Sequence, residues 1–527
     1  MEVSTGAVPI PGDAQTVAEL IELRATSDPH REALVDSRRR LSFDELETET
    51  RRWANALTAL GLVPGDRIAA SMANSVDLVL SFLAAMRAGL VWVGISRALT
   101  PVERDGLLVD SGASVLLVAG SVDPGPSTIV DVTADGWLHA PDPATALPTV
   151  DPLAPAAIAY TSGTTGRPKG VVHSQRNMIL PGVVARSRGD GDGRIGMYLP
   201  LTSLNMQVLG PVYALVNAQC CVCIERSDVG SVVAAVAAEK IERLSAAAAT
   251  VYDLVEGETR VADLASLHAV TVGGSATPDW LVDAYVDKFG RRFLSGYGLT
   301  EAPSSVTRER ADQPHRAGSS GPALPQFELV VVDDDGRPIT VGEIGEICFR
   351  AATTGPFAHV YTPMLGYWNR VGGAGHDDLH DVQAVADEWA FVDEWVRTGD
   401  IGRLDRDGEL YVVDRRTDLI VRGGTNVYPA EVERVLLADE RIAQCAVVAR
   451  PDSRLGQVPV VFVQPRPGAT VSAAEVLLRC RSSLATFKVP VEVFLVEDLP
   501  RNAMGKILRH TLRAALSPSP TELPDLP

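Results

Sequence analysis

The sequence predicts an α/β protein of more than one domain, and three observations support that prediction. At 527 residues the chain is too long for a single hydrophobic core, so two or more domains are expected. From about residue 40, segments with helical spacing alternate with short apolar runs, which is typical of parallel sheets covered by helices. Between Phe327 and Val413, short strands separated by Asp- and Gly-rich turns predict an antiparallel subdomain.

The individual elements follow from the local patterns, taken in chain order. Apolar residues at helical spacing predict helices at 42–60, 76–89, 429–437 and 473–484. Apolar runs bounded by turn residues predict strands at 66–72, 90–95, 327–333, 345–350, 408–413, 442–450 and 459–465. Helix and strand patterns also alternate through 231–255 and 268–298. The polar, proline-rich tail 517–527 is expected to be disordered.

Composition excludes several classes of function. The formal net charge of −19 argues against a nucleic-acid-binding surface, which would need a basic patch. The N-terminus lacks the basic start and apolar centre of a signal peptide. The most apolar segment, 76–95, carries Asp77 and is interrupted by Arg87, so no membrane span is expected. These features predict a cytoplasmic enzyme, and the net charge says little about small-molecule substrates, because a local pocket can differ in sign from the whole chain.

The cysteines predict buried free thiols rather than a metal site. None of the six belongs to a pair of CxxC motifs, and the run CCVC lies in an apolar, strand-like stretch. Such usage suits a reducing compartment. The cysteines stand at Cys220, Cys221, Cys223, Cys348, Cys445 and Cys480.

The stretch YTSGTTGRPKGVVHS at 160–174 is too rich in Gly, Ser and Thr for a core strand or helix. One interpretation is a solvated turn that binds nothing. A P-loop is a second, but from Gly163 its second glycine would fall on Pro168, so that pattern fails. A third is a phosphate-binding loop, in which backbone N–H groups, hydroxyls and Lys169 face a polyphosphate. The strand-like AAIAY just before the loop would place it at a strand end, where α/β proteins bind ligands.

Here the sequence resembles the adenylate-forming superfamily, which comprises acyl- and aryl-coenzyme A ligases, peptide-synthetase adenylation domains and beetle luciferases. Besides the loop, four motifs match in the expected order: GYGLTE at 296–301, RTGD at 397–400, GGTNVYPAEVE at 423–433 and RNAMGKILR at 501–509. The resemblance spans roughly residues 15–515 and is strongest to the acyl-coenzyme A ligases. It implies a large N-terminal domain of parallel-sheet α/β subdomains with a small antiparallel, barrel-like subdomain, at 1–416. A small mobile α+β domain would follow at 417–516.

The resemblance implies an ATP site. The loop would grip the β- and γ-phosphates, with Lys169 closing it, and Tyr297 would stack on adenine. Asp400 would accept both ribose hydroxyls, because a carboxylate has two acceptor oxygens and no donors, and Arg415 would lie on the ribose side. The implied ATP-binding residues are Thr161, Ser162, Gly163, Thr164, Thr165, Lys169, Gly274, Ser275, Gly296, Tyr297, Gly298, Asp400 and Arg415.

Three residues match catalytic positions of that family. Thr300 would bond a phosphate oxygen, and Glu301 would bind Mg²⁺, a hard cation that prefers oxygen ligands. Lys506 would enter from the small domain and bridge the α-phosphate and the attacking carboxylate. A compact ammonium at that point is expected to lower the barrier by several kcal/mol, about the size of one oxyanion-type donor.

A second half-reaction is implied as well, in which the small domain swings and a thiol attacks the acyl-adenylate. Gly423 and Gly424 would keep the backbone slim beside the thiol's path. The pivot in the family is usually Asp or Lys, whereas this chain has Thr417, whose β-branch is stiffer. Hinges are not restricted to one residue type, so the departure does not exclude alternation.

The acid itself is poorly defined by the sequence. Relatives that activate α-amino acids place an Asp near the ammonium, and 198–213 contains none, so an amino acid is not expected. The pocket is predicted around Ser203, Leu204, Val251 and Gly273, with Met206, Val208 and Leu254 in an apolar wall. Without the aromatic residue that many relatives carry there, the pocket is expected to admit a bulky or polycyclic acid. The same apolar side chains also suit a hydrophobic core.

The resulting expectation is a ligase that uses ATP and Mg²⁺ to form an acyl-adenylate and then a coenzyme A thioester. One alternative stops at adenylation and hands the acyl group to the phosphopantetheine of an acyl carrier protein or to a downstream enzyme. A nucleotide-binding relative without catalysis, and a luciferase-like oxidation, are less favoured. A hydrolase or zinc enzyme is disfavoured because G-x-S-x-G and H-E-x-x-H are absent, and His376 and His380 stand in an acidic loop. The sequence assigns no function to the acidic insert 371–396 and no oligomeric state.

Overall fold

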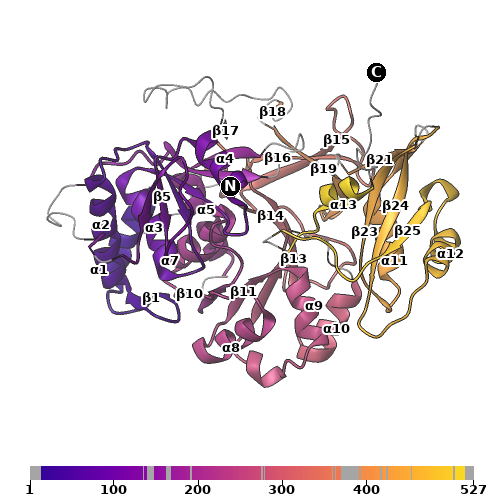
Figure 1. Cartoon of the computed structure of the whole chain (residues 1–527), viewed down its shortest axis with the longest axis horizontal. Coiled ribbons are helices and arrows are strands. Elements are labelled where there is room, and N and C mark those ends of the chain that lie inside the picture. Colours follow the sequence, from indigo (N-terminus) through magenta and orange to yellow (C-terminus); the bar gives the residue numbers. More distant parts are fainter. Residues whose placement is uncertain are drawn as a thin grey trace, which may run out of the picture.

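A computed structural model describes residues 14–516 apart from 135, 139–146, 162–167, 190–192, 275–276, 278, 359, 362–363, 369–390, 393–394, 416–417, 423–424, 453 and 503–504. Two sheets with helices and a smaller antiparallel sheet build the described residues up to 415. A unit with its own sheet, residues 420–515, lies at one end of the molecule (yellow in Figure 1) and is called the C-terminal unit below.

The first sheet has seven strands in the order β17-β8-β7-β4-β3-β5-β6. Strands β7 to β6 of that order are parallel, whereas β8 and β17 run antiparallel at the edge. The strands are β3 (Arg67–Ser71), β4 (Val91–Gly94), β5 (Val115–Val118), β6 (Thr128–Asp131), β7 (Pro155–Thr161), β8 (Lys169–Ser174) and β17 (Gly366–Trp368).

The second sheet has eight strands in the order β14-β13-β12-β11-β9-β10-β1-β2, parallel except at the two edges. The strands are β1 (Glu32–Val35), β2 (Arg40–Ser42), β9 (Ile195–Met197), β10 (Cys221–Cys223), β11 (Arg243–Ala246), β12 (Ala269–Val272), β13 (Leu294–Leu299) and β14 (Ser304–Arg308). The apolar run CCVC thus contains a buried strand, and all six cysteines are free and buried, as predicted.

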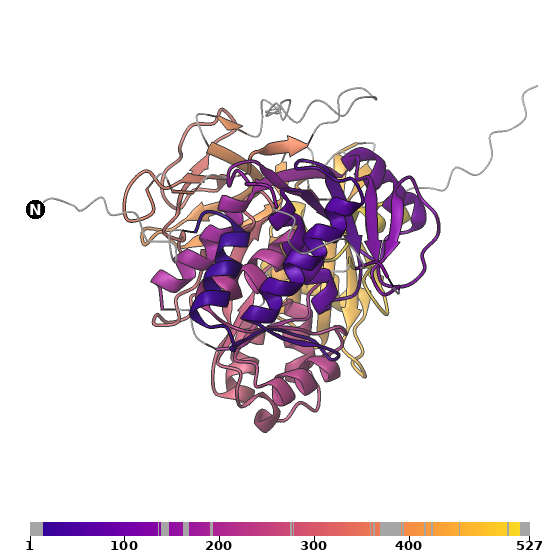
Figure 2. The same cartoon turned by 90° about the vertical axis from the view of Figure 1, so that its left-hand side faces the viewer.

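Helices lie between and around these sheets, and one hydrophobic core joins side chains from both sheets to the helices between them (Figure 2). The helices are α1 (Val17–Ser27), α2 (Phe43–Ala59), α3 (Val76–Ala88), α4 (Pro101–Ser111), α5 (Gln175–Ser187), α6 (Leu204–Gln207), the π-helical turn η2 (Val208–Val212), α7 (Tyr213–Asn217), α8 (Val229–Glu239), α9 (Ala248–Glu256) and α10 (Asp279–Phe289).

The most apolar segment of the sequence forms a core helix. Helix α3 begins at the N-cap Ser75 and ends at Gly89, which adopts the left-handed conformation that favours glycine (φ +69°). Every residue of α3 is buried, and Arg87 is ion-paired with Glu47 and, at 2.9 Å, with Glu22. Across the described part of the chain, no helix has the length and hydropathy that a membrane crossing would need.

The antiparallel subdomain predicted from residue 327 onward is present. Its sheet has the order β15-β16-β19-β18, with β20 paired to β19. The strands are β15 (Phe327–Val332), β16 (Gly345–Ala351), β18 (Phe391–Val392), β19 (Trp395–Leu404) and β20 (Leu410–Arg415). The register of β19 and β20 places Asp400 opposite Arg415.

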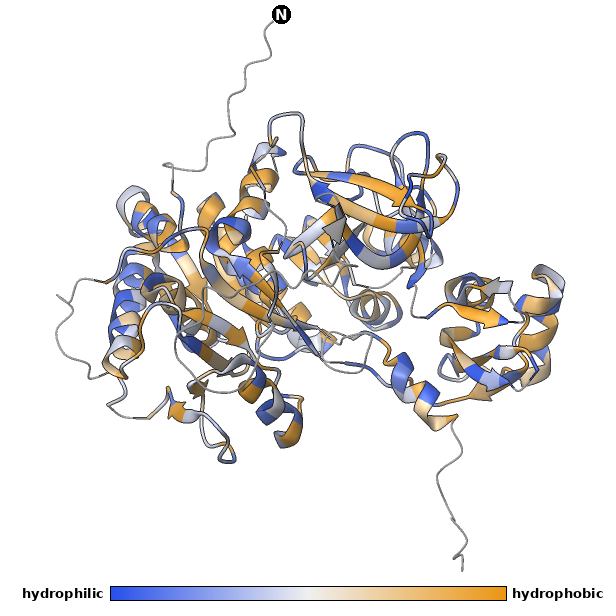
Figure 3. Ribbon diagram, turned by 90° about the horizontal axis from the view of Figure 1, so that it is seen from above, coloured by the Kyte–Doolittle hydropathy of each residue, from blue (hydrophilic) through white to orange (hydrophobic). Residues whose placement is uncertain are grey.

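The C-terminal unit has two hydrophobic clusters of its own, and Figure 3 shows it standing apart from the rest of the chain. Its elements are β21 (Ile420–Arg422), β22 (Thr425–Val427), α11 (Pro429–Leu437), β23 (Ile442–Asp452), β24 (Gly456–Pro465), α12 (Ala473–Ser483), β25 (Glu492–Leu495) and α13 (Arg509–Ala515). The predicted α/β fold class is therefore confirmed. The boundary between 416 and 417, the disorder of 517–527 and most of the acidic insert lie outside the described residues, so these stay predictions.

A close backbone contact joins the two large sheets next to the predicted pocket. Gly94 ends β4, and a Cβ added there would lie 1.9 Å from the carbonyl oxygen of Thr202, in the segment between β9 and α6. No side chain fits at that distance, so only glycine lets the two backbones approach.

We expect Gly94→Ala to lower the free energy of unfolding of the large part by about 1–3 kcal/mol, as overpacking does. Thermal unfolding measures the change. Gly106→Ala in the exposed middle of α4 is the matched control, because a Cβ there meets nothing within 4 Å. It should stabilise by about 0.5–1 kcal/mol. Equal effects of the two substitutions would contradict this account.

Candidate active site

The predicted phosphate-binding loop joins two antiparallel strands at the edge of the first sheet. Thr161 ends β7 opposite Lys169, the first residue of β8, and the Thr161 hydroxyl donates to the Lys169 carbonyl at 3.5 Å. The Lys169 Nζ lies 5.1 Å from the centre of the Tyr367 ring. Ser162, Gly163, Thr164 and Thr165 lie outside the described residues, so their contacts with phosphate stay predictions.

A chain of contacts links that hairpin to the motif after β13. The Tyr367 hydroxyl donates to Glu301 Oε1 at 3.0 Å, so Lys169, Tyr367 and Glu301 are neighbours. Burial raises the pKa of Glu301 above its usual value, against the lowering effects of the Tyr367 hydrogen bond and of Arg415. Tyr367 thus connects the predicted basic residue of the phosphate site, Lys169, with its predicted acidic residue, Glu301.

His173 contacts the backbone of the GYGLTE motif at Thr300. Its Nε2 lies 2.8 Å from the carbonyl oxygen of Thr300, and because a carbonyl only accepts, this nitrogen carries the proton. Burial lowers the pKa of His173 to about 4, so the ring is neutral at physiological pH. His173 stands in the loop motif as part of VVHS, which does not match a hydrolase motif, and its contact with Thr300 could not be predicted because the two residues are 127 positions apart.

Asp400 is the centre of the predicted ribose site. Its carboxylate is 5% exposed, accepts the Tyr297 hydroxyl at Oδ2 over 2.7 Å and is ion-paired at Oδ1 with Arg415 Nε at 3.2 Å. Burial, with the Asp400 charge, raises the pKa of Tyr297 well above its usual range. Three predicted residues from β13, β19 and β20 are therefore in direct contact.

Lys506 reaches this cluster from the C-terminal unit. A short bridge between Arg501 and Ile507 forms its loop, and Gly505 adopts the left-handed conformation (φ +77°). A Cβ added to Gly505 would lie 3.7 Å from Ala247 Cβ, at the carboxyl end of β11. Burial, with the nearby Arg415 charge, lowers the pKa of Lys506 to about 8, while Asp400 partly opposes the shift.

The predicted glycines lie at the carboxyl ends of β12 and β13. Gly274 has φ +83°, which favours glycine. Gly298 faces β14 so closely that a Cβ would lie 2.5 Å from the Ser304 carbonyl oxygen. A Cβ at Gly296 would lie 3.0 Å from the Thr307 carbonyl oxygen, whereas Gly273 has ordinary space. Ser275 lies outside the described residues.

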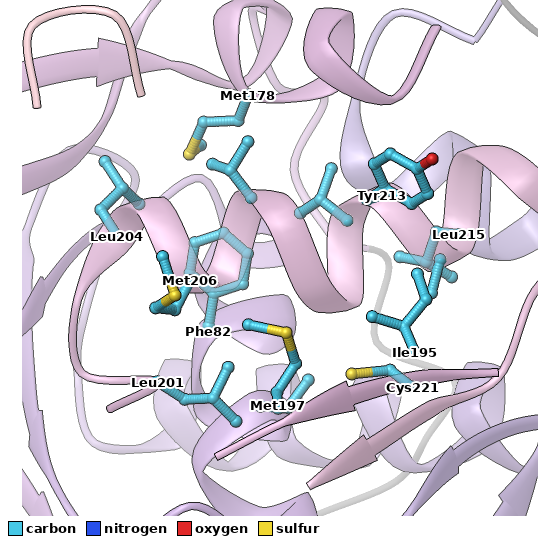
Figure 4. Close-up of a cluster of buried hydrophobic side chains, with 14 of the residues drawn as sticks. Phe82, Met178, Ile195, Met197, Leu201, Leu204, Met206, Tyr213, Leu215 and Cys221 are labelled. Carbon is cyan, nitrogen blue, oxygen red and sulfur yellow. The ribbon is translucent and has the colours of Figure 1, made fainter. Parts of the chain in front are cut away.

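The structure places the predicted apolar pocket wall in the core. Leu204 is 2% exposed and Val251 is fully buried. Figure 4 shows Leu204 and Met206 directed into a cluster with Phe82 and Met197. The core interpretation of these side chains is therefore favoured over the pocket interpretation, because no surface of them is left for a ligand.

A cavity of about 80 Å³ lies instead between α5, η2 and the second sheet, where β14 closes its edge. None of the four predicted pocket residues, Ser203, Leu204, Val251 and Gly273, lines it. The sequence missed this cavity because its polar lining comes from separate segments. It includes Arg188, Tyr213, Arg243, Ser245, Thr271, Ser304, Ser305, Arg308 and Gln326.

The link to the C-terminal unit has its own polar contacts. Asp414, at the end of β20, accepts from the backbone N–H of Ala430 in the first turn of α11 at 2.9 Å. Burial raises the pKa of Asp414 to about 6. The predicted hinge Thr417 and the predicted thiol-channel residues Gly423 and Gly424 lie outside the described residues.

One side chain holds the C-terminal unit against the large part. Arg466, next to the end of β24, lies with its guanidinium carbon 4.4 Å from the centre of the Trp280 ring and 5.5 Å from that of Tyr252. It is also ion-paired with Glu256 at 2.6 Å. Helices α9 and α10 supply these partners and lie beside the C-terminal unit (Figure 1).

Known proteins resemble the chain over nearly its whole length. A family model described as AMP-binding enzyme matches residues 21–368, and one for the AMP-binding enzyme C-terminal domain matches 431–506. A feruloyl-CoA synthase from an Amycolatopsis species is 33% identical over 511 residues, covering 93% of this chain and 97% of that protein. The indoleacetate–CoA ligase of Aromatoleum aromaticum is 32% identical over 519 residues, covering 94% and 97%.

A solved structure agrees with these sequence matches. The o-succinylbenzoate coenzyme A synthetase of Bacillus subtilis, in complex with ATP and a magnesium ion, matches with a TM-score of 0.81 and 30% identity. The match covers 94% of this chain and 98% of that one.

We expect Arg466→Ala to loosen the contact between the C-terminal unit and α9 and α10. The lost cation–π contact and half-exposed ion pair contribute about 1–2 kcal/mol together, roughly a tenfold change in the docked fraction. Amide hydrogen exchange in α9 (248–256) and α10 (279–289) measures the change in the docked fraction.

Arg441→Ala is the control for that experiment. The Arg441 carbonyl accepts the Arg466 backbone N–H, but its side chain is ion-paired with Asp439 and Glu475 and donates to the Thr470 carbonyl, all within its own unit. Exchange should rise in the Arg466 variant alone, and a rise in both or in neither would refute the docking role.

Proposed function

The chain belongs to the AMP-binding enzyme family, and on that premise we propose that it joins a non-amino-acid carboxylic acid to coenzyme A through an acyl-adenylate. As a member of the adenylate-forming acid–CoA ligases, it is an enzyme of the ligase class. The observation that carries the finer proposal is that the charges of Asp400 and Arg415, which contact each other and Tyr297 in the large part, act on Lys506 of the C-terminal unit. Two separately folded units contribute to that cluster.

The first step needs positive charge. A carboxylate oxygen of the acid forms a bond to the α-phosphorus of ATP, and the bond from that phosphorus to the bridging oxygen breaks, releasing pyrophosphate. Both reactants are anions, so an ammonium beside the reacting phosphorus stabilises the transition state more than the ground state. Lys506 is proposed for that role, because its loop packs on the carboxyl end of β11 and the charges of Arg415 and Asp400 act on its ammonium.

Asp400 retains capacity for the ribose. A carboxylate has about four acceptor positions, and in this structure the Tyr297 hydroxyl and Arg415 use two of them. The remaining positions suit two ribose hydroxyls, which are donors. The same contacts hold the Tyr297 ring in place for the proposed stacking on adenine.

One carboxylate of the site, that of Glu301, suits the binding of a magnesium ion. Mg²⁺ in nucleotide sites takes one or two carboxylates and completes its shell with phosphate oxygens and waters. Glu301 is such a carboxylate. In the described part of the chain, no group of three or more His, Cys, Asp or Glu residues forms a metal cage. The donor set therefore suits a cation shared with phosphates, and when bound the cation would neutralise charge on the β- and γ-phosphates.

The second step is proposed to follow a swing of the C-terminal unit. The coenzyme A sulfur forms a bond to the acyl carbon, the bond from that carbon to the AMP oxygen breaks, and the thiol proton is lost. Thr417 is proposed as the pivot, with Gly423 and Gly424 beside the thiol. One alternative stops at the acyl-adenylate, from which a carrier-protein phosphopantetheine or a partner enzyme takes the acyl group, and the departure at Thr417 does not decide between the two.

Relatives of this chain are named for aromatic acids and for long-chain fatty acids. Feruloyl, indoleacetate and o-succinylbenzoate all contain an aromatic ring beside the carboxylic acid. We therefore favour an aromatic acid over a plain short-chain one. An amino acid is not favoured, since no acidic residue stands between Tyr198 and Tyr213 to pair with an ammonium.

A panel of aromatic and aliphatic acids tests the proposal. Pyrophosphate release is measured with and without coenzyme A, and the products are identified by mass spectrometry. We expect an acyl-CoA product with at least one acid. An acyl-adenylate that transfers only to carrier-protein phosphopantetheine would favour the alternative acceptor. If none of the acids causes pyrophosphate release, both the ligase proposal and the alternative acceptor are refuted.

We expect Lys506→Ala to lower pyrophosphate release about 10²–10³-fold, which corresponds to the loss of one charged donor at the reacting centre. ATP binding, measured by calorimetry, should change less than about threefold, since the phosphates have other partners. Lys488→Ala is the control, because Lys488 is paired with Glu431 inside the C-terminal unit. Near-normal release by the Lys506 variant would remove this residue from the mechanism.

Lys506 is also expected to make the rate of pyrophosphate release depend on pH. With its pKa lowered to about 8, Lys506 is charged below that pH and loses its proton above it. For pyrophosphate release, kcat/KM should therefore fall above about pH 8, approaching tenfold per pH unit. Lys506→Arg should lack this limb, because arginine stays charged.

A further inference from the structure

The cavity beside α5 has a polar wall on its sheet side and on its β14 side. Thr271 of β12 and Ser305 of β14 line it, with Arg243 of β11 at its base. Leu209 of η2 and Val184 of α5 form the opposite, apolar wall. A cavity that only filled a packing defect would be apolar throughout. This one combines an apolar wall with hydrogen-bonding groups, as ligand sites do.

The cavity continues the proposed reaction site into the protein. Thr271, which lines the cavity, stands in β12 two residues before Gly273, which directly follows the end of that strand. On the neighbouring edge, Ser305 is paired with Gly298 and Ser304 with Leu299, directly before Thr300. A molecule whose carboxylate lies at the strand ends would therefore extend its far end into the cavity.

Gln326 is the feature that the fold does not explain. This residue is 1% exposed, and within the described residues neither its Oε1 nor its Nε2 has a hydrogen-bond partner. Its backbone is fixed, because the Gln326 carbonyl accepts from Ala352 at 2.9 Å just before β15. A buried amide without partners destabilises the folded protein. It offers two donors and one acceptor to whatever enters the cavity.

We propose that this cavity holds the far end of the acid, and that this end carries an oxygen substituent hydrogen-bonded to the Gln326 amide. The inference rests on the proposed function and names its substrate class as ring acids with a distal hydroxyl or carboxyl. A hydroxyl both donates and accepts, so it can satisfy both ends of the amide, whereas a carboxylate accepts only. The volume is about half that of a cavity that holds benzene, so it takes part of a ring and one substituent.

The test compares cinnamate, para-hydroxycinnamate and para-carboxycinnamate, scored as kcat/KM for pyrophosphate release. We expect wild type to prefer at least one oxygen-bearing acid over cinnamate by about tenfold or more, because a site built for a hydroxyl rejects analogues without it. Gln326→Met keeps length and shape but removes the amide. It should reduce that preference to about twofold or less while cinnamate is still activated.

Two further variants sharpen the result. Gln219→Met is the matched control, because Gln219 is also fully buried with neither side-chain end partnered among the described residues, yet it does not line the cavity. It should leave the preference unchanged. Gln326→Glu replaces the donor end by a charge, so it should disfavour para-carboxycinnamate and spare para-hydroxycinnamate.

The outcomes separate this inference from the function on which it rests. If acids are activated but Gln326→Met leaves their ranking unchanged, the inference is overturned and the ligase proposal stands. If no acid in the wider panel releases pyrophosphate, the function itself fails. Should Gln326→Met not fold, the shift in melting temperature of wild type with each of the three acids decides. Equal shifts, or a complex structure with Gln326 bonded to water alone, would also overturn the inference.

Discussion

The buried carboxylate of Asp400 is the interaction on which the rest of the site depends. A charge that is 5% exposed must be paired, and Asp400 is paired with residues of β13 and β20 at once. The second sheet and the antiparallel sheet are thereby fixed to each other at their shared edge. Lys506, which approaches on a loop of the C-terminal unit, is held in the field of this carboxylate and of Arg415. Removing the carboxylate would leave Arg415 and Lys506 facing each other without an anion between them.

A swing of the C-terminal unit would have to break the contacts that join this unit to the large part. The Gly505–Ala247 approach, the Asp414–Ala430 hydrogen bond and the contacts of Arg466 all cross from one part to the other. The hydrogen bond and the Arg466 contacts are polar and are worth about 1–2 kcal/mol each, and the Gly505 approach involves no side chain of the C-terminal unit. Weak contacts of this kind suit a unit that must leave and return, whereas a hydrophobic interface would hold it in one orientation.

The sequence predicted those parts of the site that are contiguous and missed those that are assembled. Lys506, Asp400 and Glu301 stand in short motifs, and the alternating pattern around them correctly indicated the α/β fold. The partners of His173 and Arg466 lie far away in sequence, and the cavity around Gln326 is lined from separate segments, so no local pattern shows these arrangements. Leu204 and Val251 are buried in the core, and an apolar residue next to a site looks the same in sequence whether it faces a ligand or the core.

The places where the fold is locally unfavourable coincide with the proposed chemistry. Burial raises the pKa of Glu301, lowers that of Lys506 and isolates the Gln326 amide, and each of these effects opposes stability. Elsewhere the same protein satisfies its buried charges, as Arg87 shows with two carboxylates. Gln219 is also buried without side-chain partners among the described residues and does not line the cavity, so an unpartnered amide alone does not mark a site. What distinguishes these three effects is that they lie around one proposed site. Local conflicts of this kind are expected at functional sites, because a group already satisfied by the protein has nothing left to offer a nucleotide, a cation or an acid.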